Sequence, residues 1–257
     1  MTSQQATKYA VEERAAWITL DSPQNRNALS VALVGELEGH LRTAVADPEV
    51  RAIVLTGNGP AFCAGADLKS RGDAVAPGSG RTNPFVEILK LMWEGPKPVI
   101  AAVNGHAFGG GIGLVAAADI AIAAEGAKFS FSEVRLGLIP AIISVVVLQK
   151  LGVHDAMRLF LTGERFLAAR AQEYRLVHRV VAPDGLREAV QEEAKSIALG
   201  GPNAVAEAKR LIRTVSRVSM DEGFAYAEAK ISELFASAEA AEGMGAFVQK
   251  RPPRWAE

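Results

Sequence analysis

The chain has 257 residues, of which 49% are hydrophobic and 22% charged, and this ordinary globular composition excludes disorder, collagen and a coiled coil as its main state. Its 28 basic and 29 acidic residues give a net charge of −1, which argues against nucleic-acid binding, because that function needs a strongly positive surface. With one cysteine, Cys63, the chain forms no internal disulfide, and this favours a cytoplasmic setting.

No segment has the features of a signal peptide or of a membrane span. The start of the chain, Met1–Lys8, is polar, and polar residues and glycines interrupt the longest stretch without lysine or arginine, Pro98–Ala127. The apolar run Leu136–Leu148 is too short to cross a bilayer, and Pro140 interrupts it. We therefore expect a soluble protein that begins at Met1 without a removed leader.

Strand-like and helix-like segments alternate along the first two-thirds of the chain. Trp17–Leu20 predicts a strand, and leucines at every fourth position then predict an amphipathic helix that ends at Asp47–Pro48. The leucines are Leu29, Leu33, Leu37 and Leu41, with Asn27 or Ser30 as the expected cap. Ala52–Thr56 predicts a buried strand, which the turn residues Gly57–Pro60 follow.

The middle of the chain continues the alternation, and the last third is mostly helical from His154 onward. Arg71–Pro84 is rich in Gly, Pro and Ser and predicts a long lid-like loop. The elements expected next are a helix over 85–92, a strand at Val99–Val103, a helix from about Gly111, a strand at Asp119–Ala123 and a short strand within Lys128–Ser132. This order predicts an α/β fold with a helical C-terminal region.

Two glycine-rich turns, at 61–68 and 105–113, each follow a strand and precede a helical pattern. The first N–H groups of a helix lack partners within the helix, so such a turn can bind an anion or an oxygen that becomes negative during a reaction. The looser dinucleotide pattern occurs once, as Gly111, Gly113 and Ala116, and the P-loop pattern is absent. From spacing alone, turns without any ligand are an equally good interpretation.

Several blocks of residues in these segments resemble the enoyl-CoA hydratase/isomerase (crotonase) family. The blocks occur in the family's order and cover nearly the whole chain. They are Pro23 with Asn25 and Asn27–Leu29, Phe62–Leu68, Asn104–Gly105 with Phe108–Gly111, Phe131–Val134 with Gly137–Pro140, Leu161–Glu164, and Glu242–Met244 with Ala246–Phe247 and Lys250–Pro252.

The resemblance implies a crotonase-type right-handed spiral of β-β-α turns over residues 1–197. It also implies a C-terminal helical region over 198–257 that builds a homotrimer, often paired into a hexamer. The family binds acyl-CoA thioesters and polarises the thioester carbonyl with two backbone N–H groups, which by position are those of Ala66 and Gly110. Fixed amides of this kind stabilise an enolate-like oxygen without reorganising.

The resemblance assigns acid–base chemistry to one glutamate. Family hydratases use two, and their positions here hold Glu133 and Gly113, so one carboxylate is missing. The apolar neighbours Phe131, Val134 and Leu136 are expected to raise the pKa of Glu133, although an ion pair with Arg135 is the alternative interpretation. The chain is similar to a single-glutamate subgroup that includes methylglutaconyl-CoA hydratases, and Pro140–Ala141 supports this assignment.

The resemblance also implies contacts to the coenzyme A part of the substrate. The expected CoA-binding residues are Arg26, Ala64, Asp67, Leu68, Lys69, Phe108, Gly109, Pro140 and Lys250, the last of which reaches a neighbouring subunit's CoA. Asp67 is also expected to cap a helix that begins directly after it. The four histidines are scattered without metal-type spacing, so neither a metal nor a permanently bound cofactor is expected.

The leading hypothesis is an acyl-CoA lyase that hydrates a 2-enoyl-CoA, or dehydrates a 3-hydroxyacyl-CoA, in a fatty-acid-type pathway. Double-bond isomerisation needs only one base and is the main alternative. Decarboxylation needs only the oxyanion hole, and a non-catalytic acyl-CoA binding protein would explain the lost glutamate. Partners are limited to the acyl-CoA and further copies of the chain, with no nucleic acid and no membrane.

Overall fold

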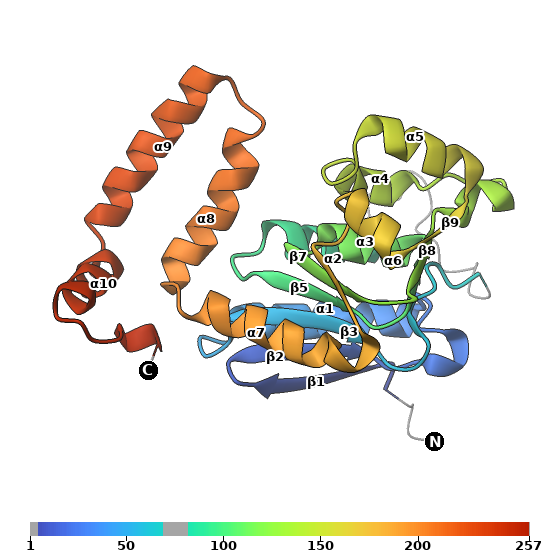
Figure 1. Cartoon of the computed structure of the whole chain (residues 1–257), viewed down its shortest axis with the longest axis horizontal. Helices are drawn as coiled ribbons and strands as arrows, with labels where there is room; N and C mark the ends of the chain where they lie inside the picture. Colours follow the sequence, from blue (N-terminus) through green and yellow to red (C-terminus); the bar gives the residue numbers. More distant parts are fainter. Residues whose placement is uncertain (1–4, 69–81, 257) are drawn as a thin grey trace.

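The computed structural model describes residues 5–68 and 82–256, which form two sheets enclosed by helices (Figure 1). The larger sheet has the strand order β1-β2-β3-β5-β7-β10, and all its neighbours are parallel except β1 and β2. These strands are β1 (Thr7–Glu12), β2 (Ala15–Leu20), β3 (Ala52–Gly57), β5 (Val99–Val103), β7 (Ile120–Ala124) and β10 (Arg179–Val181).

The smaller sheet has the order β4-β6-β8-β9, with only β9 antiparallel to its neighbour. Its strands are β4 (Ala61–Cys63), β6 (His106–Phe108), β8 (Lys128–Ser130) and β9 (Arg165–Leu167). Each strand of the large sheet from β3 to β7 is followed by one of the small sheet. The chain therefore advances in β-β-α turns, which stack the strand-to-helix connections above one another.

Ten α-helices are described. They are α1 (Val31–Ala46), α2 (Pro84–Glu94), α3 (Gly110–Ala117), α4 (Ala141–Val147), α5 (Val153–Thr162), α6 (Ala168–Glu173), α7 (Leu186–Ala198), α8 (Pro202–Val215), α9 (Met220–Phe235) and α10 (Ala238–Val248). In Figure 1, α8, α9 and α10 extend away from the sheets as an arm. None of the helices in the described ranges is long and apolar enough to span a bilayer.

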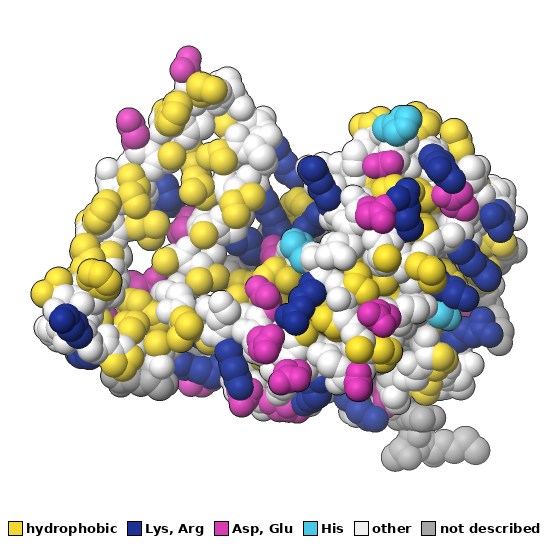
Figure 2. Space-filling model, viewed as in Figure 1, with side chains coloured by type: hydrophobic (Ala, Val, Ile, Leu, Met, Phe, Trp, Pro, Cys, Tyr) yellow, Lys and Arg dark blue, Asp and Glu magenta, His cyan; other side chains and the backbone are white. Residues whose placement is uncertain are grey.

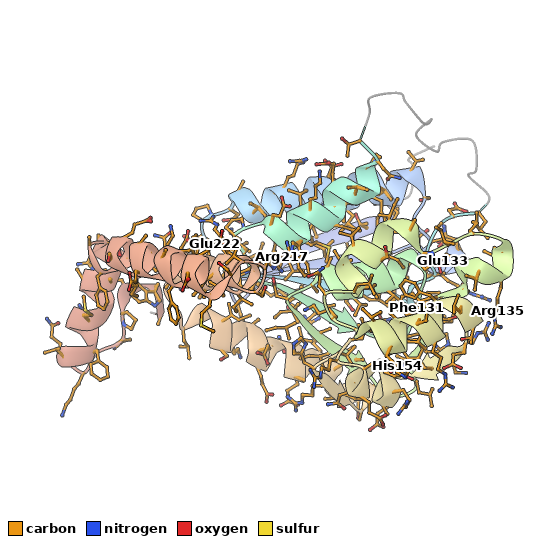
Figure 3. The ribbon with its side chains drawn as sticks, turned by 90° about the horizontal axis from the view of Figure 1, so that it is seen from above. Phe131, Glu133, Arg135, His154, Arg217 and Glu222 are labelled. Carbon is orange, nitrogen blue, oxygen red and sulfur yellow. The ribbon has the colours of Figure 1, made fainter. Side chains whose placement is uncertain are left out.

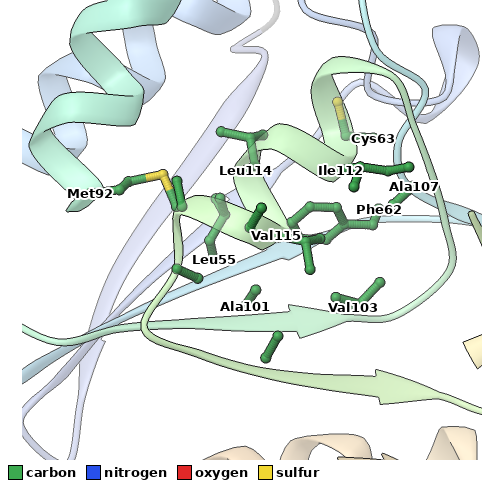
Figure 4. Close-up of a cluster of buried hydrophobic side chains, with 14 of the residues drawn as sticks. Leu55, Phe62, Cys63, Met92, Ala101, Val103, Ala107, Ile112, Leu114 and Val115 are labelled. Carbon is green, nitrogen blue, oxygen red and sulfur yellow. The ribbon is translucent and has the colours of Figure 1, made fainter. Parts of the chain in front are cut away.

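The main core lies between the sheets and helices α1, α2 and α3. Figure 4 shows part of it, where Phe62, Met92 and Leu114 meet above the alanine and valine side chains of β5. A second apolar cluster joins α7 to the opposite face of the large sheet through residues such as Trp17, Ile100 and Val190. Burial on both faces explains why β3 and β5 are continuous apolar runs without alternation.

Most of the predicted elements are confirmed, including the short strand within Lys128–Ser132, which is β8, but β1 and four short strands were missed. Val99–Val103 is a strand with the predicted bounds, and Ser30 caps α1 by accepting the Leu33 N–H at 3.3 Å. Asn27 has a different role, described below. The helix expected after Asp67 and most of the loop 71–84 lie outside the described residues, while Pro84 begins α2. The missed strands β4, β6, β9 and β10 have three residues each, which is too few for a detectable period.

Candidate active site

The two glycine-rich turns lie directly against each other. A Cβ atom built on Gly65 would be 2.7 Å from the Phe108 carbonyl oxygen and 3.3 Å from the Gly110 nitrogen. Gly65 also has a φ of +89°, a conformation that residues with a side chain rarely adopt. Glycine is therefore required at this position both for the shape of the first turn and for its approach to the second.

The backbone N–H groups of Ala66 and Gly110 are available beside this contact. Gly110 is the first residue of α3, so its N–H has no acceptor within the helix. The backbone at Leu29 lies beside the first turn, and the Leu29 N–H donates to the Gly65 carbonyl at 2.8 Å. Within residues 5–68 and 82–256, neither the Ala66 nor the Gly110 N–H donates to a protein acceptor.

A buried asparagine holds the first turn in place. The Asn27 side chain accepts the Ser22 N–H at 2.8 Å and donates to the Asn58 and Ala61 carbonyls at 3.0 and 2.8 Å. Arg26 and Asn27 both have positive φ angles, +58° and +55°. Backbone strain of this kind persists where surrounding contacts compensate it, and here those contacts keep Arg26 next to the turn, where its carbonyl accepts the Ala64 N–H.

The Glu133 carboxyl group lies against the second turn. A Cβ built on Gly109 would be 3.0 Å from Glu133 Oε1, while Oε2 is buried without a hydrogen-bond partner among the described residues. Burial raises the pKa of Glu133 above its ordinary value, in the direction that the sequence predicted. The alternative ion pair is not formed, because Arg135 donates to the Thr162 carbonyl and lies at the edge of the molecule (Figure 3).

Position 113, which lacks the second carboxylate, is closed by apolar side chains. A Cβ built on Gly113 would be 2.4 Å from Ile143 Cγ2 and 3.6 Å from Phe85 Cζ. Ile143 comes from α4 and Phe85 from the first turn of α2, so two separate helices fill the space. Sequence reasoning identified the missing glutamate but not the residues that occupy its place, because they are distant along the chain.

A cavity of about 320 Å³ opens beside the first turn and is lined by basic groups. Three residues predicted to bind CoA, Arg26, Ala64 and Phe108, contribute to it. Lys128 and Arg165 also line the cavity and were missed in the sequence, because no local motif links β6, β8 and β9. His106, from the second glycine-rich turn, lines it as well.

The electrostatics of this cavity favour an anion. Burial lowers the pKa of His106, and the charges of Lys128, Arg165 and Arg26 lower it further. The Arg165 guanidinium lies 5.6 Å above the Phe108 ring. The side chains of Arg26, Lys128 and Arg165 form no ion pair with any residue that the structure describes. Three uncompensated cations beside a neutral histidine can bind phosphate groups.

The other predicted site residues have varied positions. Leu68 is 45% exposed beside the first turn, and Pro140 is buried at the start of α4. Asp67 follows the bridge at Ala66, and Lys69 lies outside the described residues. Lys250 follows α10, on the side of the molecule opposite the small sheet, and does not line the cavity (Figure 1).

Cys63 does not contribute to the site. Cys63 is completely buried in the core, and burial raises the pKa of its thiol to about 12. No group of three or more potential metal ligands occurs in the part of the chain that the structure describes.

Comparisons with known proteins agree with the fold that positions the two glycine-rich turns and Glu133. A family model described as enoyl-CoA hydratase/isomerase matches residues 11–257. A probable enoyl-CoA hydratase from Rhizobium meliloti is 39% identical over 93% of both chains, and carnitinyl-CoA dehydratase from Salmonella enteritidis is 36% identical over the same shares. The crystal structure of a putative enoyl-CoA hydratase/isomerase from Legionella pneumophila has a TM-score of 0.89 at 37% identity, covering 98% of this chain and all of that one.

Proposed function

Because the chain belongs to the enoyl-CoA hydratase/isomerase family and is an enoyl-CoA hydratase-type enzyme, we propose that it hydrates a 2-enoyl-CoA with Glu133 as its one catalytic carboxylate. The reverse reaction dehydrates a 3-hydroxyacyl-CoA. The observation that supports this most is the position of the buried Glu133 carboxyl group against the Gly109–Gly110 turn.

In this proposal the thioester oxygen accepts hydrogen bonds from the Ala66 and Gly110 N–H groups. Both donors are without a protein acceptor in the described chain, and their turns touch at Gly65 and Gly110. As water adds to C3, electrons move onto the thioester oxygen and form an enolate. Donors that are already fixed stabilise this charge without reorganisation, and each is worth about 10²–10³ in rate.

Glu133 carries out both proton transfers of the reaction. Its carboxylate takes a proton from water as the water oxygen bonds to C3, and the resulting carboxylic acid then gives a proton to C2 of the enolate. The net change is addition of one water molecule. Burial raises the pKa of Glu133, and this makes its carboxylate a stronger base toward the water proton.

The basic cavity is proposed to hold the phosphate-bearing end of CoA. Arg26, Lys128 and Arg165 supply the charge, and the backbone around Ala64, Asp67, Leu68 and Gly109 continues from it toward the Ala66 amide. Lys69 and Pro140 remain predicted contacts. Lys250 would contribute only from another subunit, because its own arm leads away from the small sheet (Figure 1).

For the acyl group we propose a branched or carboxylated 2-enoyl chain of the methylglutaconyl type. The filled position at Gly113 supports a site with one carboxylate, which is the property of that subgroup. The same observation favours a second function, enoyl-CoA double-bond isomerisation, because that reaction moves one proton between carbons and needs no second carboxylate.

Oxygen-labelled water distinguishes these two functions. Hydration places the label on C3 of the product, whereas isomerisation of a 3-enoyl-CoA incorporates none. The substrates are an unbranched 2-enoyl-CoA, a branched carboxylated 2-enoyl-CoA and a 3-enoyl-CoA. Labelled product from the branched carboxylated compound supports the main proposal. Turnover of the 3-enoyl-CoA alone contradicts it, and binding without turnover of any compound identifies a non-catalytic acyl-CoA binding protein.

A further inference from the structure

A second cavity, of about 280 Å³, lies between the C-terminal end of α2 and helix α8. Phe85 and Trp93 are eight residues apart on α2, so this cavity is about 12 Å from the candidate active site along the helix axis. Figure 2 shows Lys and Arg side chains gathered where the arm meets the body. The lining residues used below are Trp93, Glu94, Lys209, Arg210, Arg213 and Arg217.

Positive charge exceeds negative charge around this cavity. Asp119 pairs with both Lys209, at 2.8 Å, and Arg213, at 2.5 Å, so one carboxylate serves two cations. The Lys150 ammonium also lies near, 3.5 Å from the Asp119 carbonyl oxygen.

The remaining cations are only partly neutralised. Arg210 pairs with Glu207, and Arg217 donates to the neutral Gln149 amide at 3.3 Å. Glu94 is the one acidic residue in the lining. The lining itself therefore holds four cations and one carboxylate, and Asp119 and Glu207 beside it neutralise only part of this excess.

One guanidinium nitrogen in this cluster has no acceptor. Arg213 Nη1 is buried and makes no hydrogen bond in the described chain, although a guanidinium carries five donors that a folded protein normally satisfies. The Arg213 guanidinium stacks 4.0 Å above the Trp93 ring, and that of Arg217 lies 5.9 Å from the same ring. The indole thus holds two arginines at the same cavity.

We propose that this cavity binds a small, doubly charged oxyanion, namely inorganic phosphate or a phosphate monoester. Such a group supplies the missing acceptor for Arg213 Nη1 and balances the excess charge. Guanidinium groups bind phosphate oxygens with short, charge-assisted hydrogen bonds. The bound anion would join α8 to the end of α2, and so fix the arm on the body.

Calorimetric titration of the full chain tests this site, with chloride used to keep the ionic strength constant. Inorganic phosphate and glycerol 3-phosphate are titrated separately, so that the two sources of the same chemistry are distinguished. We expect saturable binding that Arg217→Gln weakens about tenfold or more, consistent with loss of a hydrogen bond to a charged group. Arg213→Lys keeps the charge beside Asp119 but lacks the second nitrogen, and it is expected to weaken binding similarly.

Two arginine variants serve as controls. Arg179→Gln removes an exposed arginine that pairs with Glu192 away from the cavity, and it should leave the affinity unchanged. Arg165→Gln removes a cation from the first cavity and should also leave this site intact. Equal weakening by Arg179→Gln would indicate a general charge effect, and loss of binding in Arg165→Gln would place the phosphate in the first cavity. Either result overturns the proposal.

Absence of saturable binding to the wild-type chain also overturns it. Where the wild-type chain binds no phosphate, the solution mass of Arg213→Lys is compared with that of the wild type. A lower mass of the variant would indicate that a second copy of the chain supplies the acceptor for Arg213 Nη1.

Discussion

At the residue scale, Glu133 combines two properties that oppose each other. Its Oε2 atom is buried without a partner in the described chain, which is unfavourable for folding when the carboxyl is charged. The same burial raises its pKa, which suits a group that accepts and returns a proton. A buried, unpaired carboxyl is therefore expected of a catalytic group, although it lowers the stability of the folded protein.

Replacing Glu133 with glutamine separates these properties. We expect Glu133→Gln to lower the hydration rate by about 10²–10⁴, because the proton carrier is lost while the shape is kept. The folded-state pKa lies above the unfolded value, so wild-type stability falls as pH rises through the folded pKa. The variant should thus be more stable than wild type at neutral pH and equally stable below about pH 4, where the carboxyl is protonated in both states.

Steady-state rates and urea unfolding at both pH values test this prediction. A variant that is less stable than wild type at neutral pH would show that Glu133 has a structural partner.

At the element scale, the two strand-to-helix turns form one unit because they meet at Gly65. Gly65→Ala introduces two effects, the cost of a left-handed conformation and the close contact with the Phe108 carbonyl. Gly126 has a similar φ, +81°, but a Cβ there meets nothing within 4 Å. It is therefore a matched control for the conformational effect alone, which is about 1–2 kcal/mol.

We expect Gly126→Ala to lose only that stability and to keep its activity. Gly65→Ala should lose more stability and also about 10²–10³ in rate, because the Ala66 and Gly110 amides move apart. Thermal unfolding and turnover of the same enoyl-CoA measure both effects. Equal activity in the two variants would show that the contact between the turns is not needed for catalysis.

Helix α3 packs closely against α4 because Gly113 has no side chain. Gly39→Ala in α1, where a Cβ meets nothing within 4 Å, should stabilise the protein by about 0.4–1 kcal/mol. Gly113→Ala should instead destabilise it by about 1–3 kcal/mol, because its Cβ overlaps Ile143 Cγ2.

Ile143→Ala alone should cost about 2–5 kcal/mol through the cavity that it leaves. The double variant should lose less than the sum of the two single changes, by more than about 0.5 kcal/mol. Denaturant unfolding of all three variants measures this coupling. Additive losses would mean that the two side chains do not compete for the same space.

At the scale of the whole molecule, the arm exposes large apolar side chains that a single chain leaves uncovered. Phe224 and Phe235 on α9 are 64% and 63% exposed, and Figure 2 shows yellow side chains along the arm. Exposed apolar surface of this extent marks an interaction site. We propose that α8 to α10, within the predicted region 198–257, join further copies of the chain into a trimer or hexamer.

Phe224→Asp should therefore lower the solution mass toward that of one chain, because it places a charge in the proposed contact. Light scattering after size-exclusion chromatography measures the mass. Val11→Asp is the control, since Val11 is also exposed, at 44%, but lies on β1 and not on the arm. A wild-type mass equal to one chain would contradict the proposed assembly.

Long periodic segments were predictable from the sequence, because their burial pattern repeats many times. The leucine helix α1 and the strands β3 and β5 are examples, and they fixed the α/β class. Glu133 and the turns at Gly65 and Gly110 were also identified in the sequence, because glycine and glutamate carry chemistry that a resemblance can transfer.

The tertiary structure alone decided what surrounds those residues. Ile143 and Phe85 close the position beside Gly113, and Lys128 and Arg165 join Arg26 at one cavity, from helices and strands far apart in the chain. The sequence determined which groups could react, since that depends on residue type. Which groups meet, and which of them are buried without a partner, depends on packing between distant segments, and no local pattern records it.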